Sequence, residues 1–166
     1  MDEEKSAQKR VVVLAMDGST DAESALQWFS KNIYRKDDEV FVIHCLHHTA
    51  NHAMGCTEHM TMGVLFSSFQ SLNLQAIEKA FQKETNDAVK LCSQLEELLK
   101  KYEIEGKVIR VQGDPGHKIV TTAEECKASL IVLGSRGLGA IRRTILGSVS
   151  DYILHHSTVP VLVYRG

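Results

Sequence analysis

The stretch Arg10-Val-Val-Val-Leu-Ala-Met-Asp-Gly-Ser-Thr-Asp-Ala-Glu-Ser-Ala-Leu-Gln-Trp-Phe29 decides the expected fold. Its first part, Val11–Ala15, is a continuous apolar run rich in β-branched residues, which is typical of a strand buried on both faces of a parallel sheet. Asp17-Gly18-Ser19 breaks this run, and apolar residues then recur at helical spacing as far as Ile33. The spacing of Thr20-Asp-Ala-Glu23 matches a capping box, so we expect the helix to begin there.

The same alternation continues to the end of the chain. A long helix is marked by apolar positions from Ile77 to Tyr102 and ends near Gly106. A shorter helix starts at Asp114-Pro115, a cap followed by proline, and runs to about Lys127, and the last helix covers about Ser148 to His156. The further strands are expected at Val40–Leu46, Lys107–Val111, Leu130–Leu133 and Val161–Tyr164.

Strands that alternate with helices predict an α/β fold, in which a parallel sheet carries helices on both faces. Ligands of such sheets bind beyond the carboxyl ends of the strands. The loops after Ala15, Leu46 and Leu133 are therefore the candidate ligand positions.

The composition is that of an ordinary globular protein. The 166 residues are 43% hydrophobic and 24% charged, which suits one domain, here residues 10–166. The formal net charge of −2 argues against nucleic acid as a partner, and no apolar run approaches a membrane span. The start, Met1–Lys5, lacks an apolar signal region, so we expect a cytoplasmic protein. Its cysteines are then expected to be reduced thiols: Cys45, Cys56, Cys92 and Cys126.

Two segments stand outside the regular pattern. Residues 1–9 are charged and are expected to form a flexible tail, and His47–Asn73 is an insertion whose single charged residue is Glu58. A long connection of this kind is either a mobile insertion or a functional one. Its apolar residues Val64-Leu65-Phe66 and Phe69 could pack against the body or a partner, so we expect the insertion to tune partners or access to the site.

Histidines gather around this insertion and raise the question of a metal. Zinc accepts imidazole and thiolate ligands, but the spacing here matches no finger motif, so we expect no specific metal site and at most adventitious binding. The residues concerned are His44, His47, His48, His52, Cys56 and His59.

The most informative segment for function is Gly134-Ser-Arg-Gly-Leu-Gly-Ala-Ile-Arg-Arg-Thr-Ile-Leu-Gly-Ser148. Glycines let a backbone approach a ligand and expose its N–H groups, and Gly147-Ser148 opens a helix whose N-terminus favours phosphate oxygens. Arg136, Arg142 and Arg143 add guanidinium groups that suit phosphate geometry. The segment matches neither a P-loop nor a dinucleotide fingerprint. It therefore predicts a phosphate cradle, or alternatively a tight turn that binds nothing.

Gly134, Gly137, Gly147 and Ser148 fit the pattern of glycine, two residues, glycine, nine residues, glycine, and serine or threonine. In this pattern the sequence resembles the ATP-binding members of the universal stress protein family, from about Arg10 to Arg165. The likeness extends to an aspartate after the first strand, a Gly-Asp-Pro turn before the third helix and a Pro-Val-Leu-Val ending.

The resemblance implies an open five-stranded parallel sheet in the order 3-2-1-4-5 that dimerises through its last strand. It also implies a nucleotide-binding domain for ATP, often with Mg²⁺. By position, Asp17 would contact the nucleotide or its metal, and Cys45 would lie against adenine, where a small apolar residue is commoner. The remaining implied contacts are Leu133 and Gly134 flanking the nucleotide, Arg136 and Gly137 on its phosphate side, and Gly147, Ser148 and Val149 on the phosphates. Asp17 also suits a turn or a helix cap.

The sequence shows no dedicated base for hydrolysis, so no catalytic residue is assigned. The leading hypothesis is an ATP-binding regulatory module of the stress response, with an unidentified protein partner. The alternatives are a slow ATPase in the same cleft and a nucleotide-free dimeric scaffold. An uncharged edge strand seeks a partner, so Val161–Tyr164 is the expected homodimer contact.

Overall fold

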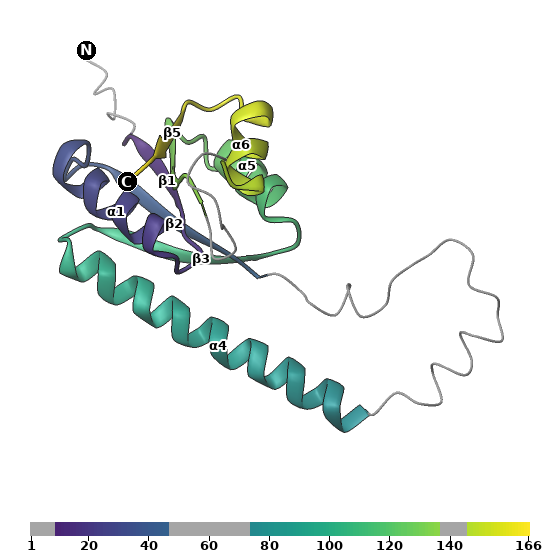
Figure 1. Ribbon diagram of the computed structural model, residues 1–166. Coiled ribbons are helices and arrows are strands. Elements are labelled where there is room, and N and C mark those ends of the chain that lie inside the picture. Colours follow the sequence, from purple (N-terminus) through teal and green to yellow (C-terminus); the bar gives the residue numbers. More distant parts are fainter. Residues whose placement is uncertain (1–8, 47–73, 137–145) are drawn as a thin grey trace, which may run out of the picture. The chain divides into compact units, whose positions relative to one another are not determined.

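The computed structural model describes residues 9–46, 74–136 and 146–166 (Figure 1). The chain divides into two compact units, one of residues 1–47 and 92–166 and one of residues 48–91. The predictions for residues 1–8, for the insertion 47–73 and for the loop residues 137–145 lie outside the described residues. In the second unit, the described residues 74–91 are helical.

Five parallel strands form the sheet, in the order β3-β2-β1-β4-β5. The strands are β1 Val11–Ala15, β2 Glu39–Leu46, β3 Gly106–Gln112, β4 Leu130–Gly134 and β5 Val161–Tyr164. The helices are α1 Thr20–Asn32, α4 Leu74–Lys101, α5 Pro115–Glu125 and α6 Ser148–His156. The predicted strand order and the alternation of strands and helices are confirmed.

Apolar side chains fill both faces of the sheet, because successive strand residues point to opposite sides. Figure 1 shows α5 and α6 together on one side and α1 on the other. On the first side, Val13, Ile43 and Ile131 pack in one cluster with side chains of α5 and with Ile153 of α6. Leu26 and Phe29 of α1 are fully buried on the second side. The expected helices on both faces are present.

Two helix ends differ from expectation. Ser19, not Thr20, caps α1, because its extended backbone lets Oγ accept a hydrogen bond from the N–H of Ala22 at 3.2 Å. The capping-box assignment is wrong, since the third helical position is then alanine. Helix α5 ends at Glu125, and Lys127 has a positive φ of 53°. The predicted cap Asp114 is confirmed by its bond from the N–H of His117 at 2.9 Å.

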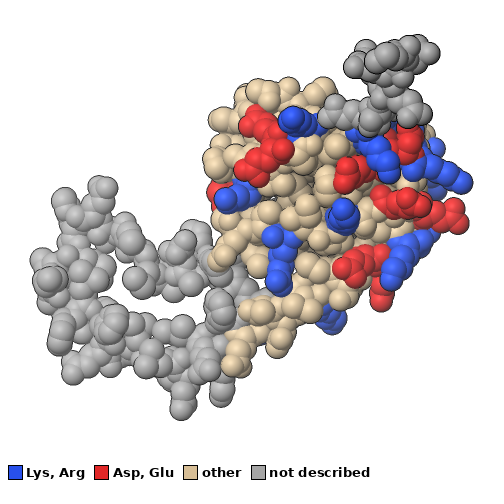
Figure 2. Space-filling view, turned by 180° about the vertical axis from the view of Figure 1, so that it is seen from behind, with Lys and Arg blue, Asp and Glu red and all other residues tan. Residues whose placement is uncertain are grey.

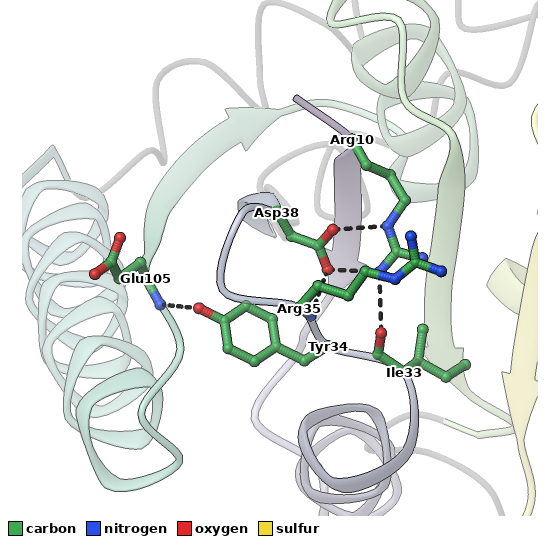
Figure 3. A network of polar contacts seen from close by, with 6 residues as sticks. All are labelled: Arg10, Ile33, Tyr34, Arg35, Asp38 and Glu105. Carbon is green, nitrogen blue, oxygen red and sulfur yellow. Dashed lines mark hydrogen bonds and ion pairs between the residues drawn. The ribbon is translucent and has the colours of Figure 1, made fainter. Parts of the chain in front are cut away.

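A buried ion pair closes the amino end of the sheet, where β1 and β2 begin (Figure 3). The guanidinium of Arg10 donates to both carboxylate oxygens of Asp38 and to the carbonyl of Ile33. The N–H of Arg35 donates to the same carboxylate at 2.9 Å. The side chain of Asp38 is 0% exposed, so every hydrogen bond it accepts comes from the protein.

The pKa of Asp38 reflects this environment. Burial alone would raise it, but the hydrogen bonds from Arg10 and the Arg35 N–H, with the charge of Arg10, lower the pKa below its ordinary value.

A second contact at this end joins two loops. The hydroxyl of Tyr34 accepts a bond from the N–H of Glu105 at 3.0 Å, which fixes the loop before β2 to the start of β3.

Charged groups are mixed over the surface that Figure 2 presents, where Lys and Arg alternate with Asp and Glu among the described residues. A membrane-crossing helix, which must be both long and apolar, does not occur among the residues that the structure describes.

Candidate functional site

The turn after β1 is built by Asp17, Gly18 and Ser19. The Oδ1 atom of Asp17 accepts a bond from the N–H of Ser19 at 3.0 Å, and Gly18 has a φ of 82°, a conformation that favours glycine. The turn places Ser19 at the N-cap position of α1. Asp17 thus has the turn role that its sequence allowed, at the carboxyl end of the central strand.

Gly134, the first glycine of the pattern, is needed for packing. A Cβ atom here would lie 2.8 Å from the carbonyl carbon of Asp21 and 3.0 Å from the nitrogen of Ala22. Both are backbone atoms of the first turn of α1, so they cannot give way as a flexible side chain would. The glycine therefore lets the end of β4 lie directly against α1.

Ser135 is the hub of a polar cluster that the sequence interpretation missed. Its hydroxyl donates to Oδ2 of Asp21 at 3.1 Å, and its carbonyl accepts from the N–H of Gly147 at 2.8 Å and from Oγ of Ser150 at 3.0 Å. Nε of Arg136 lies 3.4 Å from the same Asp21 oxygen. Ser135 occupies a variable position of the glycine pattern, and Asp21 is an acidic residue of a kind that is common in the first turn of a helix. The sequence alone therefore predicts no special role for either residue.

Gly147 caps α6 and contrasts with Gly134. Its φ of −67° and ψ of 152° suit any residue, and among the described residues no side-chain cap bond is made at this helix start. The nearest neighbour of an added Cβ would be the Cα of Arg136 at 3.5 Å, an ordinary contact. Neither backbone strain nor packing against the described residues requires glycine here. Because glycine has no side chain, it does not cap the first N–H groups of α6, which have no partner within the helix.

Two other predicted site residues belong partly to the protein interior. Leu133 is 4% exposed and its side chain lies in the core, so only its backbone could flank a ligand. The thiol of Cys45 donates to the carbonyl of Gly113 at 3.2 Å. Burial, reinforced by the charge of Asp114, raises the pKa of this thiol, so it is protonated at neutral pH.

The structure brings together most of the predicted positions. Asp17, Gly134, Arg136 and Gly147 lie around the carboxyl ends of β1 and β4 and the start of α6, where Ser148 is exposed and Val149 half-buried. Cys45 lies farther along the same edge, beside the loop after β3. Gly137, Arg142 and Arg143 lie outside the described residues.

A metal centre is not found in the described part of the chain, where no three His, Cys, Asp or Glu side chains gather. The buried ring of His44 has its Nδ1 3.1 Å from the carbonyl of Met16, which accounts for this histidine without a metal. The other residues of the histidine-rich stretch lie outside the described ranges.

The sequence profile described as the universal stress protein family matches residues 9–165. The chain belongs to this family. The universal stress protein YxiE of Bacillus subtilis is 27% identical over 154 residues, 93% of this chain and 97% of the relative. Among solved structures, universal stress protein UspA of Lactobacillus plantarum has a TM-score of 0.69 at 19% identity, covering 96% of this chain and 99% of that one.

A universal stress protein of Archaeoglobus fulgidus in complex with dAMP shares the same fold. Its TM-score is 0.59 at 20% identity, and the match covers 93% of this chain and 95% of that one. At this identity the likeness concerns the fold, and the nucleotide is a property of that relative.

Proposed function

We propose that this universal stress protein binds ATP at the carboxyl edge of its sheet and acts as a regulatory module of the stress response. The observation that carries the proposal is Gly147, a helix-cap glycine that neither its backbone angles nor its neighbours require. A ligand whose oxygens approach the first turn of α6 closely would explain a residue without a side chain at this position. The dAMP complex of the Archaeoglobus fulgidus relative supports an adenine nucleotide as that ligand.

The phosphates would lie at the start of α6. The N–H groups of Ser148 and Val149 and the positive end of the helix dipole favour anionic oxygens there. Arg136 lies beside these N–H groups, because a Cβ atom added to Gly147 would be 3.5 Å from the Cα of Arg136. Its ion pair with Asp21 places a fixed cation at the phosphate side.

Mg²⁺ fits this site only together with the nucleotide. The ion prefers oxygen ligands and retains water, and it is commonly held by one or two carboxylates plus phosphate oxygens. Asp17 is the carboxylate at the end of β1, with Oδ1 already bonded to the N–H of Ser19. We therefore assign Asp17 as the single described protein ligand that a phosphate-bound Mg²⁺ would use.

The proposal is for binding and not for efficient hydrolysis. Hydrolysis needs a group that positions or deprotonates the attacking water. Of the described carboxylates at this edge, Asp17 forms the turn and would bind Mg²⁺, Asp21 holds Ser135 and Arg136, and Asp114 caps α5. Each of the three therefore has a role other than that of a general base, which favours a nucleotide-dependent switch over a catalytic site.

We also propose that two copies pair through β5. This strand lies at the edge of the sheet, carries no charged side chain and is half-buried throughout. Edge strands without charge are prone to pair with another chain. A twofold axis beside β5 would continue the sheet into the second copy.

A matched pair of substitutions at Gly147 tests the nucleotide site. Aspartate and asparagine are both good helix caps of nearly equal size, so both variants should fold at least as stably as the parent. The carboxylate of Gly147→Asp would stand where phosphates bind, and like charges a few ångströms apart repel by about 4 kcal/mol in a surface environment. We expect calorimetric titration to show ATP binding weakened roughly 100-fold or more in Gly147→Asp, and clearly less in Gly147→Asn.

Circular dichroism and urea unfolding provide the control that both variants are folded. A larger loss in the aspartate variant supports a phosphate at the start of α6. ATP affinity equal to the parent in both variants would overturn the site.

A further inference from the structure

One residue, Ser135, joins the start of α6 to the edge strand. Its N–H donates to the carbonyl of Tyr164, the last residue of β5, at 2.8 Å. Its carbonyl accepts from the N–H of Gly147 at 2.8 Å and from the hydroxyl of Ser150 at 3.0 Å. The same hydroxyl lies 2.9 Å from the carbonyl of Gly147, so it bridges the carbonyls of Ser135 and Gly147 with its single proton. Ser135 and Ser150 are each 3% exposed, so water does not compete strongly for these bonds.

The position of Ser135 is also fixed from a third direction. Its hydroxyl bonds to Asp21 in the first turn of α1, and that carboxylate also holds Arg136. The side chain of Ser135 therefore bonds to α1, whereas its backbone bonds to the start of α6 and to the end of β5. This separation makes it possible to remove one connection and leave the others.

The contacts of Tyr164 show that a movement of Ser135 would displace the end of β5. The ring of Tyr164 lies against Trp28 of α1, with ring centroids 6.1 Å apart. Tyr164 pairs with Gly134 in the sheet, directly before Ser135. The end of β5 is thus bonded through its carbonyl to the same residue that contacts the cap of α6.

We propose that Ser135 couples nucleotide occupancy to the pairing of β5, and that Ser150 is the positioning residue that holds the Ser135 carbonyl. This inference rests on the proposed function, namely ATP at the start of α6 and a dimer through β5. Phosphate bound by the first turn of α6 restricts that turn and, through Gly147 and Ser150, the backbone of Ser135. The N–H of Ser135 then holds the end of β5 in place, so less ordering is needed when two strands pair.

Linkage requires the effect to run in both directions. If ATP strengthens the dimer by a given factor, dimerisation strengthens ATP binding by the same factor. Couplings of this kind are typically about 5- to 150-fold. We expect ATP to lower the dimer dissociation constant at least about fivefold in the parent protein.

Three substitutions distinguish coupling through Ser150 and Ser135 from a general effect of a substitution on packing. Ser150→Ala removes the hydroxyl that bridges the carbonyls of Ser135 and Gly147. It leaves the bond from the Gly147 N–H, so the Ser135 carbonyl keeps one partner. Ser150→Thr retains the hydroxyl and should restore the coupling. Ser135→Ala is the matched control, because it removes a buried hydroxyl of equal size but leaves both backbone connections.

The measurement is sedimentation equilibrium with and without ATP, combined with calorimetric ATP titration above and below the dimer dissociation constant. We expect coupling of at least fivefold in the parent, Ser150→Thr and Ser135→Ala, and less than twofold in Ser150→Ala. Hydrogen exchange of the Ser135 N–H should slow with ATP in the parent and not in Ser150→Ala.

The inference fails in three recognisable ways. A parent that binds ATP with an unchanged dimer constant overturns the coupling and leaves the nucleotide site standing. Full coupling in Ser150→Ala overturns the role of Ser150. A parent that does not bind ATP at all overturns the proposed function itself, and the coupling with it.

Discussion

The two ends of the sheet are built in opposite ways. At the amino end, Asp38 is fully buried and its carboxylate is satisfied by Arg10 and the Arg35 N–H. At the carboxyl end, α6 starts at a glycine without a side-chain cap. Both ends join segments of the chain through a carboxylate, Asp38 at one and Asp21 at the other, but at the carboxyl end the cap residue of α6 offers no side chain to the helix N–H groups. We therefore expect the amino end to contribute mainly to stability, and we propose the carboxyl end for ligand binding.

The largest effect that separates the two ends is expected from Asp38→Ala. The substitution leaves the Arg10 guanidinium, which is 25% exposed, without its buried partner. Breaking such a pair costs about 3 kcal/mol, so the free energy of unfolding should fall by about that amount in urea titration. Glu39→Ala is the control, since Glu39 is half-buried and lies 3.9 Å from the exposed Lys107, and it should cost less than about 0.5 kcal/mol.

The ATP affinity of the folded Asp38→Ala protein should equal that of the parent. Because the pKa of Asp38 is lowered in the folded protein, its contribution is complete above the ordinary aspartate value of about 4 and is lost as the pH falls through the lowered pKa. The stability gap between the parent and Asp38→Asn should therefore narrow below about pH 4. A gap that widens in acid would contradict the assignment of the buried carboxylate.

The second prediction compares two glycines of one motif. Gly134→Ala places a methyl group 2.8 Å from the backbone of Asp21, and overpacking of this kind costs about 2 kcal/mol. Gly147→Ala meets its nearest atom at 3.5 Å, so no overpacking is expected and the cost should be about 1 kcal/mol or less, from the poorer N-cap preference of alanine. Thermal unfolding of both variants measures this difference. Equal destabilisation would show that the two glycines share one role.

The third prediction concerns the two edges of the sheet. Leu162→Lys on β5 should raise the dimer dissociation constant at least tenfold, about 1.4 kcal/mol, because it charges the strand that we expect to pair. Val108→Lys on the opposite edge is the matched control, since both residues are half-buried on edge strands, and β3 already carries Lys107 and Arg110. Light scattering that reports the same dimer for both variants would place the interface elsewhere.

The smallest effect is expected at Cys45. Its thiol donates to the Gly113 carbonyl, and a serine hydroxyl can do the same, so Cys45→Ser should change the free energy of unfolding by less than about 1 kcal/mol. Burial raises the pKa of the thiol, so its alkylation by iodoacetamide should be slower at pH 7 than that of free cysteine. Rapid alkylation at pH 7 would contradict a half-buried, protonated thiol.

Much of the fold could be predicted from local sequence patterns. The β-branched run Val11–Ala15 and the Asp114-Pro115 cap depend on nearby residues, and both elements formed where expected. The cap at Ser19 was missed because a competing pattern, Thr20 to Glu23, looked equally local. The strand order came from the family resemblance, since no local pattern says which strands are neighbours.

The site was only partly predictable for the same reason. The glycine spacing identified the loop, but the different roles of Gly134 and Gly147 depend on how closely α1 approaches β4. Ser135 and Asp21 are 114 positions apart, and their hydrogen bond exists only once the sheet has formed. Contacts of this range have no signal in a single sequence.

An ATP titration followed by two-dimensional amide NMR tests the contrast between the two ends most directly. We expect the N–H signals of Ser148 and Val149 to shift as ATP saturates the site, while those of Arg35 and Asp38 at the amino end stay in place. The same titration of Gly147→Asp should leave all four signals unmoved at equal ATP concentration. Shifts confined to the amino end, or ATP binding that leaves Ser148 and Val149 unchanged, would contradict a nucleotide site at the start of α6.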